Sequence, residues 1–263
     1  MDQPHFFAHS WCKFPFDLAL ANWVRYVLPT AKQTRFDNTH QHWLRCGETW
    51  FAGVNVLPND SDGAVAGGPP LSGTAVDFLH DQLQITRLEW EAAQVSICYP
   101  GYPQPMSGES RAAFRFRRDR CAAHIDGILP EGEKRRRHLR EHHQFILGIP
   151  LARYEEGAAP LVVWEGSHEI ARQTLIRCYD GRAAARWGDV DITEVYHDLR
   201  RRIFAECECV EIVADPGEAY LVHRLALHGV APWRSSAVAD ADRRIICYFR
   251  PEARSSEAWL KAP

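Results

Sequence analysis

The chain has 263 residues, 46% of them hydrophobic and 11% aromatic, a composition that supplies one large buried core. We predict a single domain over residues 1–263. The formal net charge of −3 gives no general attraction to nucleic acid or to an anionic membrane, and no apolar stretch approaches the roughly 18 residues of a membrane-spanning helix, so we expect neither as a partner. The eight cysteines contain no CxxC pair and the N-terminal sequence lacks a signal-peptide pattern, so we expect a cytoplasmic protein.

Residues 1–87 are predicted to form a helical N-terminal part. The segment DLALANWVRYVL carries apolar residues at helical spacing. These residues are Leu18, Leu20, Trp23, Val24 and Val27. A second segment, TAVDFLHDQLQI, follows a loop rich in Gly and Pro, and its Thr74 and Asp77 are spaced as a capping pair. Neither segment carries obvious chemistry.

From residue 88 to 263 the sequence changes to short β-type runs separated by Gly, Pro and charged segments. The runs are WEAAQVSICY, AAFRF, QFILGIPL, APLVVW, CVEIVA, GEAYLVHRLALHG and RRIICYF. One helical insert, DITEVYHDLRRRIFAE over 191–206, places Val195, Leu199 and Ile203 at four-residue steps. The fold is therefore predicted to be mainly β, with N-terminal and inserted α-helices.

The stretch CAAHIDGILP contains His124 and Asp126, two positions apart. On a strand, residues at this spacing point to the same face, so both side chains can bind one metal ion. His228 ends another apolar run, just before Gly229, which can turn the chain. Two histidines and one carboxylate form the facial triad that binds non-haem Fe(II) and leaves coordination positions open. We predict His124, Asp126 and His228 as metal ligands and catalytic residues.

Other metal-binding residues are weighed against these three. His223 is a rival third ligand, but it stands five positions from His228 and so has the opposite strand parity. His168 lies in a turn-like Gly-Ser-His and is interpreted as structural. Cys207 and Cys209 could hold a soft metal, but an isolated pair is more typical of packed thiols.

Two other classes of function stay open at this point. The run from His138 to His142 reads His-x-x-Glu-His, the inverted zinc-peptidase signature, in which two histidines on a helix hold zinc and the glutamate, here Glu141, activates water. Against this, the run leads directly into the β-type QFILGIPL, and the cationic EGEKRRR before it is unfavourable at a helix start. The third class is a non-catalytic β-sandwich binding module without a metal.

The runs HIDG, PLARYEEGAAPLVVWEGSH, DPGEAYLVHRLALHG and DRRIICYF resemble, in order and spacing, the phytanoyl-CoA dioxygenase family of Fe(II)/2-oxoglutarate-dependent oxygenases. The resemblance covers residues 121–250. It implies a double-stranded β-helix, a jelly-roll and cupin-like fold, with iron at His124, Asp126 and His228. It also implies a dioxygenase that hydroxylates a small-molecule substrate and converts the co-substrate 2-oxoglutarate to succinate and CO2.

The same resemblance implies that an arginine of the last strand binds the far carboxylate of 2-oxoglutarate, and a guanidinium suits that task because it donates two parallel hydrogen bonds. Arg243 and Arg244 both stand at the start of RRIICYF. If Arg243 faces the interior, three apolar residues share its face, whereas Arg244 would bring Tyr248 and Arg250 with it. The first pattern buries fewer charges. We therefore predict Arg243 as the anchor, with Arg244 as the alternative.

The basic run EKRRRHLR over 133–140 allows two interpretations. It is a solvated loop, or, since the resemblance implies that loops near this point roof the active site, it is part of that roof, where Arg135, Arg136 or Arg137 attracts an anionic group of the substrate.

Overall fold

The computed structural model describes residues 3–86 and 88–262. Residues 1 and 263, which bound the predicted single domain, and residue 87, which ends its predicted helical part, lie outside the described residues. The α-helices are α1 (Gln3–His9), α2 (Leu18–Thr34), α3 (Thr74–Asp81), α4 (Arg111–Asp119), α5 (Ser167–Tyr179), α6 (Thr193–Glu206) and α7 (Ser256–Lys261), and the short 3-10 helices are η1 (Asn38–Trp43), η2 (Ala184–Asp189) and η3 (Asp240–Asp242). None of the described helices is long and apolar enough to cross a membrane.

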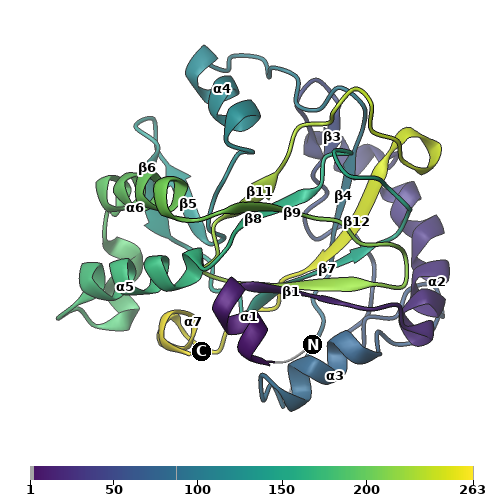
Figure 1. Ribbon diagram of the computed structural model, residues 1–263, viewed down its shortest axis with the longest axis horizontal. Helices are drawn as coiled ribbons and strands as arrows, with labels where there is room; N and C mark the ends of the chain where they lie inside the picture. The colour runs from purple at the N-terminus through teal and green to yellow at the C-terminus, as the bar shows by residue number, and fades with distance from the viewer. Residues whose placement is uncertain (1–2, 87, 263) are drawn as a thin grey trace.

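The strands belong to two larger antiparallel sheets and one hairpin (Figure 1). They are β1 (Trp11–Phe14), β2 (Leu44–Arg45), β3 (Trp50–Phe51), β4 (Gln94–Cys98), β5 (Ile128–Glu131), β6 (Arg136–Leu139), β7 (Phe145–Pro150), β8 (Leu161–Trp164), β9 (Cys209–Ile212), β10 (Ala219–His223), β11 (His228–Val230) and β12 (Arg244–Phe249). The larger sheet has the order β1-β10-β7-β12-β4-β3-β2, the smaller has β11-β8-β9, and β5 pairs with β6.

The two larger sheets pack face to face. In the cluster buried between them, Ile146 of β7 and Ile246 of β12 join Leu161 of β8 and Ile212 of β9. Sheet-on-sheet packing of this kind buries the alternate side chains that each strand directs inward. The molecule therefore has the predicted mainly β core, a double-stranded β-helix of the jelly-roll, cupin-like type.

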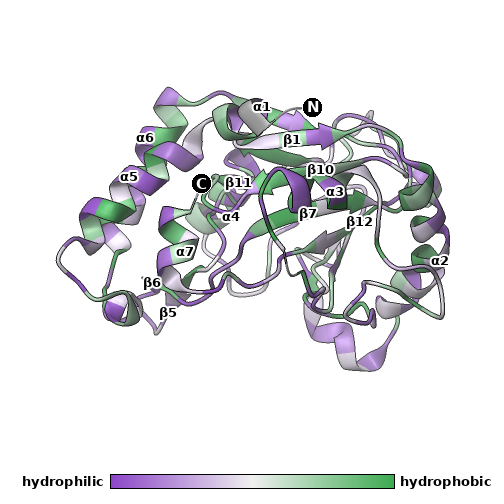
Figure 2. Cartoon of the chain, turned by 90° about the horizontal axis from the view of Figure 1, so that it is seen from below, coloured by the Kyte–Doolittle hydropathy of each residue, from purple (hydrophilic) through white to green (hydrophobic). Residues whose placement is uncertain are grey.

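The outer face of the larger sheet is also buried, because the N-terminal helices cover it. Ile245 and Phe249 of β12 belong to a second core cluster with Trp23 of α2 and Phe78 of α3. In Figure 2 hydrophobic residues are concentrated in β7 and β10, as expected for strands covered on both faces. The N-terminal part is not purely helical, since β1, β2 and β3 join the same sheet.

A second helical layer, α5, α6 and α7, lies with the β5–β6 hairpin at one end of the molecule, away from α2 (Figure 1). Its core contains Leu175 of α5, Tyr196 of α6 and Trp259 of α7, packed with Trp164 of β8. The predicted insert at 191–206 is thus confirmed as α6. Hydrophilic and hydrophobic residues alternate along α5 and α6 in Figure 2, as expected for helices with one buried face.

Three sequence-based element predictions need correction. The run AAFRF belongs to helix α4, whose start is capped by the Ser110 hydroxyl, which accepts a hydrogen bond from the Ala113 N–H at 3.2 Å. Helix α5 was not predicted; it begins after Gly166, which has a φ of +71°. The run GEAYLVHRLALHG is split into β10 and β11, which lie in different sheets. In each case a short local pattern fits two structures, and tertiary packing selects one.

The predicted capping pair of α3 is also wrong, because Asp17 caps two helices at once. One oxygen of its carboxylate accepts from the N–H groups of Ala19 and Leu20 at the start of α2, at 2.8 and 3.4 Å. The other accepts from the Thr74 N–H at the start of α3, at 2.9 Å. Thr74 is therefore already helical, and the cap comes from 57 residues away in sequence.

Candidate metal centre

His124 and His228 face each other across two chain segments that the fold brings together. The His124 N–H donates to the His228 carbonyl at 2.8 Å, and the His228 N–H donates back at 3.0 Å. His228 begins β11 instead of ending a strand, and Gly229 is needed for space, because a Cβ there would lie 2.1 Å from the Cys121 carbonyl oxygen. The expected turn at Gly229 is therefore wrong.

Asp126 does not lie on a strand, as the same-face argument assumed. His124 forms only an isolated β-bridge, and Asp126 is in the turn that precedes β5. Gly127 completes this turn with a φ of +83°, and a Cβ there would lie 2.1 Å from the Glu141 carbonyl oxygen. The turn, not strand parity, directs the carboxylate toward the histidines.

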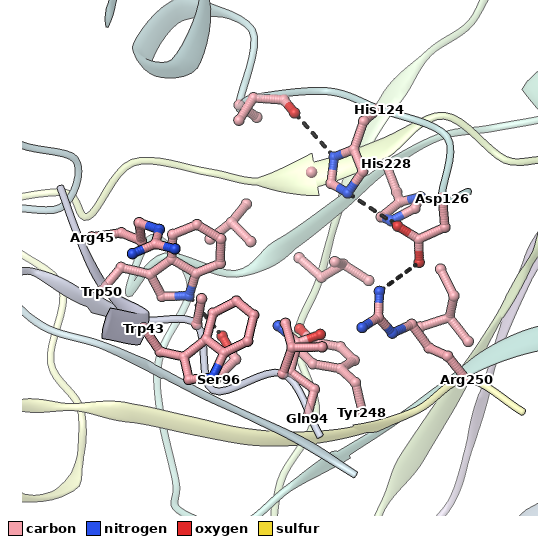
Figure 3. A pocket seen from close by; sticks show the side chains of 18 of the residues that line it. Trp43, Arg45, Trp50, Gln94, Ser96, His124, Asp126, His228, Tyr248 and Arg250 are labelled. Carbon is pink, nitrogen blue, oxygen red and sulfur yellow. Dashed lines mark hydrogen bonds and ion pairs between the residues drawn. The ribbon is translucent and has the colours of Figure 1, made fainter. Parts of the chain in front are cut away.

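The predicted ligands His124, Asp126 and His228 are brought together, with one ligand atom of each within 4.8 Å of the others (Figure 3). The His124 Nε2 lies 3.2 Å from the Asp126 Oδ1, and the His228 Nε2 lies 3.6 Å from the same oxygen. Asp126 and His228 are buried, whereas the His124 side chain is 47% exposed. One side of the cluster is therefore open to small molecules.

The donor set fits a divalent metal ion. The Nδ1 atoms of His124 and His228 lie 3.1 and 3.0 Å from the carbonyl oxygens of Ala122 and Ala226, which can only accept, so each Nδ1 carries the proton. Each Nε2 then offers a lone pair toward the carboxylate of Asp126. Three electron-pair donors that converge on one point attract a cation, and the Nδ1 hydrogen bonds fix the ring orientation that metal binding requires.

Arg250 holds the other oxygen of the carboxylate. Its guanidinium lies 3.3 Å from the Asp126 Oδ2, while the Oδ1 faces the histidines. Burial opposes ionisation of Asp126, but the positive charge of Arg250 holds the pKa of the carboxyl well below its usual range. Asp126 is thus an anion at neutral pH.

The parity prediction for the arginines is wrong. Arg244 is fully buried on the inner face of β12, whereas Arg243 precedes the strand, is half-buried and donates to the Ala241 carbonyl at 3.0 Å. The prediction assumed that apolar side chains of the strand face the inter-sheet space. Because α2 and α3 cover the outer face, Ile245 and Cys247 pack there instead.

Arg244 lies among neutral polar groups. It donates to the Tyr248 hydroxyl at 3.3 Å, the Ser96 hydroxyl at 3.0 Å and the Cys98 sulfur at 3.2 Å. Its buried Nε has no hydrogen-bond partner, and no carboxylate of the described residues forms an ion pair with it. A buried guanidinium without a counter-ion is unfavourable, so this position suits an incoming anion.

A cavity of about 290 Å³ lies beside the three predicted metal ligands. Trp43, Arg45 and Trp50 form the wall across from the histidines (Figure 3). Ser96 and Tyr248 also line the cavity, and both accept hydrogen bonds from Arg244, so Arg244 lies directly behind these two residues. The site therefore combines a metal-ligand set, a buried guanidinium and an aromatic wall.

The rival metal-binding residues lie elsewhere. The His-x-x-Glu-His run is on strand β6 and the loop after it, not on a helix; the His138 Nδ1 contacts the Gly188 carbonyl at 3.2 Å, and His142 packs edge-on against Trp259. His223 contacts His168, with ring centroids 4.6 Å apart and the rings tilted by 49°, away from the three predicted ligands. In the described part of the chain these histidines do not form a metal-binding group.

Several residues of the site were not predicted. Arg250 could have been found, because it shares the strand parity of Arg244, and the choice of parity excluded it. Trp43, Arg45 and Trp50 carry no sequence signal, since they come from a short helix and two two-residue strands. Only the pairing of β3 with β4 brings this segment to the site.

No family model matches the chain, and no curated protein matches its sequence. Among solved structures, it is similar to SnoK, a non-heme alpha ketoglutarate dependent carbocyclase from nogalamycin biosynthesis (12% identity, 96% of this chain and 85% of that chain covered, TM-score 0.47). It is also similar to AviO1 from Streptomyces viridochromogenes Tue57 (12%, 96% and 94%, TM-score 0.45) and to EctD from S. alaskensis with 2-oxoglutarate and 5-hydroxyectoine (14%, 96% and 76%, TM-score 0.45). At these low similarities, the assignment of a function rests on the site itself.

Proposed function

We propose that the protein is a non-haem Fe(II)/2-oxoglutarate-dependent dioxygenase of the phytanoyl-CoA dioxygenase family that hydroxylates a small molecule. The observation that carries the proposal is the convergence of the His124 Nε2, the Asp126 Oδ1 and the His228 Nε2 within 4.8 Å. Two nitrogen donors and one carboxylate on a double-stranded β-helix are typical of non-haem Fe(II) oxygenases. The sequence resemblance over residues 121–250 supports the same class.

In this proposal His124, Asp126 and His228 hold Fe(II). The ion would supply the redox chemistry with dioxygen and 2-oxoglutarate that ends in a hydroxylated product, succinate and CO2. The protein residues orient and enclose the reactants. The backbone carbonyls of Ala122 and Ala226 fix the two imidazole rings, and Arg250 fixes the carboxylate.

Arg244, not Arg243, is proposed to bind the far carboxylate of 2-oxoglutarate. Its burial between the sheets, its unpartnered Nε and the absence of a carboxylate counter-ion among the described residues support this role. The hydroxyls of Ser96 and Tyr248, which already contact the guanidinium, line the cavity and could donate to the same carboxylate.

The aromatic wall is proposed to bind the substrate and to exclude water. Trp43, Trp50 and Tyr102 line the cavity next to His228 and the exposed His124. Apolar walls with a few polar groups are typical of small-molecule sites. We also propose a cytoplasmic location, because all eight cysteines are free thiols.

The test is an anaerobic titration with Fe(II) and then with 2-oxoglutarate, followed by visible absorption. We expect a metal-to-ligand charge-transfer band that appears only when both are present and saturates at one Fe(II) per chain. His124→Ala and Asp126→Ala should abolish the band while the circular dichroism spectrum stays unchanged. A parent protein that binds no Fe(II) would instead favour the metal-free binding module.

A further inference from the structure

A second cavity, of about 430 Å³, adjoins the segment that carries His124 and Asp126. His124, Asp126 and Arg250 line both this cavity and the one already described, so the two spaces meet at the metal site. The far wall of the second cavity comes from the β5–β6 hairpin and from helix α6, which contribute Arg137 and Arg200. We call this space the arginine cavity.

Both arginines of the far wall pack on one aromatic ring. The Cζ atoms of Arg137 and Arg200 lie 5.6 and 4.9 Å from the ring centroid of Tyr196, and Arg200 also lies 4.8 Å from the ring centroid of Phe116. This stacking fixes both guanidiniums, so a ligand would bind without first having to order them.

No carboxylate of the described residues forms an ion pair with Arg137 or Arg200. The guanidinium of Arg137 donates a long hydrogen bond, 3.4 Å, to the Ile128 carbonyl, and the buried Nε of Arg200 has no hydrogen-bond partner among the described residues. The neighbouring arginines differ: Arg136 pairs with acidic side chains of the α6 region, and Arg135 is exposed at the hairpin turn. Two like charges held together without a counter-ion attract an anion.

The acidic residues that line the arginine cavity are already engaged. Asp126 is bound by Arg250 at 3.3 Å, and Glu141 lies 3.1 Å from the His143 ring. Neither carboxylate is paired with Arg137 or Arg200, and with Arg250 the lining carries three arginines against two carboxylates, so the cavity keeps a net positive charge.

The arginine pair is connected to the metal-binding segment through one side chain. The Tyr196 hydroxyl accepts a hydrogen bond from the N–H of Ile125, at 3.0 Å, and Ile125 stands between the ligands His124 and Asp126. An anion bound to Arg137 and Arg200 would thus lie one side chain away from the metal, at a distance that a small molecule can span.

We propose that Arg137 and Arg200 bind the oxyanion group, a phosphate, sulfate or carboxylate, of the primary substrate. The apolar body of that substrate then extends past His124 toward the metal. This inference rests on the proposed function for its use in catalysis, but anion binding itself needs neither iron nor 2-oxoglutarate. Of Arg135, Arg136 and Arg137, the three candidates in the basic run, it selects Arg137, and it adds Arg200 from helix α6.

The test uses phenyl phosphate as the probe and isothermal titration calorimetry on the full chain in EDTA. The parent should bind phenyl phosphate but not phenol. Arg137→Gln and Arg200→Gln should each weaken binding by roughly tenfold or more, the range for loss of a charge-assisted hydrogen bond. Arg135→Gln is the matched control and should bind like the parent. Arg200→Lys, which keeps the charge, should restore part of the affinity in a folded protein.

A second measurement tests the position of the site. With Mn(II) in place of iron, the phosphorus relaxation of bound phenyl phosphate should be faster than with Zn(II), and excess 2-oxoglutarate should not displace the probe. Absence of binding to the parent, equal affinity in the Arg137 and Arg200 variants, displacement by 2-oxoglutarate, or unchanged relaxation would each overturn the inference. Phenyl phosphate binding without the Fe(II)/2-oxoglutarate band would reject the oxygenase and keep the anion site.

Discussion

At the scale of single residues, the two oxygens of Asp126 have separate partners. The Oδ1 faces both histidines, and the Oδ2 contacts Arg250 at 3.3 Å. This division leaves one carboxylate oxygen for the metal and prevents rotation of the group. A residue that does not touch the metal can therefore control how tightly the metal is bound.

Arg250→Gln should weaken the binding of Co(II), an air-stable substitute for Fe(II), by about 10- to 100-fold, because the Asp126 carboxylate loses the contact that orients it. Arg250→Lys should give an intermediate affinity. The measurement is a competition titration against a chelating dye, with Arg243→Gln as the control for general loss of positive charge. Parent-like affinity in a folded Arg250→Gln protein would show that the contact has no such role.

Arg244 should control the binding of 2-oxoglutarate. Arg244→Met should raise the dissociation constant for 2-oxoglutarate by roughly 30- to several-thousand-fold, because removing one partner of a buried charge-assisted pair costs about 2–5 kcal/mol. Arg243→Met should leave it unchanged. The charge-transfer band measures both constants, and thermal unfolding checks that each variant is folded. A larger increase of the dissociation constant for Arg243→Met than for Arg244→Met would favour Arg243 as the 2-oxoglutarate anchor and contradict the proposal.

At the scale of secondary-structure elements, residues distant in sequence determine where helices begin. Asp17 accepts hydrogen bonds at the starts of both α2 and α3, so it also fixes the position of these helices against each other. The hydrogen bond from the Thr74 N–H is the largest cause that lowers the pKa of Asp17 below its usual value of 3.8, and the bonds from Ala19 and Leu20 lower it further. Burial raises the pKa, but by less than the Thr74 hydrogen bond lowers it.

Asp17→Ala should destabilise the protein by about 1–2 kcal/mol at neutral pH, the range for loss of a helix cap. Because the folded-state pKa is lowered, the stabilisation by Asp17 is present above pH 3.8 and is lost as the pH falls through the folded-state value. The difference in melting temperature between the parent and Asp17→Asn should therefore shrink as the pH falls through the folded-state pKa of Asp17.

The control for this experiment is Asp77→Ala, which removes the acidic residue that the sequence pattern paired with Thr74. Asp77 is exposed in the first turn of α3, so its loss should change stability by no more than about 0.5 kcal/mol. A larger effect for Asp77→Ala than for Asp17→Ala would contradict the shared cap.

At the scale of the whole molecule, the two apolar clusters on either face of the larger sheet do not include the proposed metal ligands. One core cluster lies between the sheets and another lies under α2 and α3, and both consist largely of apolar side chains. The turn of the Asp126 segment and the β-bridge between His124 and His228 position the proposed ligands.

Metal-free protein in EDTA should therefore keep its circular dichroism spectrum and unfold cooperatively. Co(II) at a free concentration of 100 times its dissociation constant should add about 2.7 kcal/mol to the free energy of unfolding, seen as a higher melting temperature. His228→Ala should remove this increase without lowering the melting temperature of the metal-free protein by a comparable amount. Unfolding of the parent in EDTA would indicate that the metal is part of the fold.

The sequence alone predicts the β core, the helix at 191–206 and the three ligands His124, Asp126 and His228, which the fold brings together. The β core and the helix are confirmed because apolar periodicity reports burial. The three residues are found close together because residue types that bind metal are uncommon enough for their order to be informative; their role as ligands stays a prediction. The pattern also predicts the ligands for a partly wrong reason, since a turn at Gly127 and not strand parity directs Asp126.

Tertiary structure alone decides which face of each strand is inside. Both faces of β12 are buried, so its alternation does not distinguish Arg243 from Arg244; the cover provided by α2 and α3 makes that distinction. In the same way, Arg137 and Arg200 lie over the same Tyr196 ring only because α6 packs against the hairpin. Contacts between distant segments arise from burying surfaces against each other, and a local sequence pattern does not specify which surfaces meet.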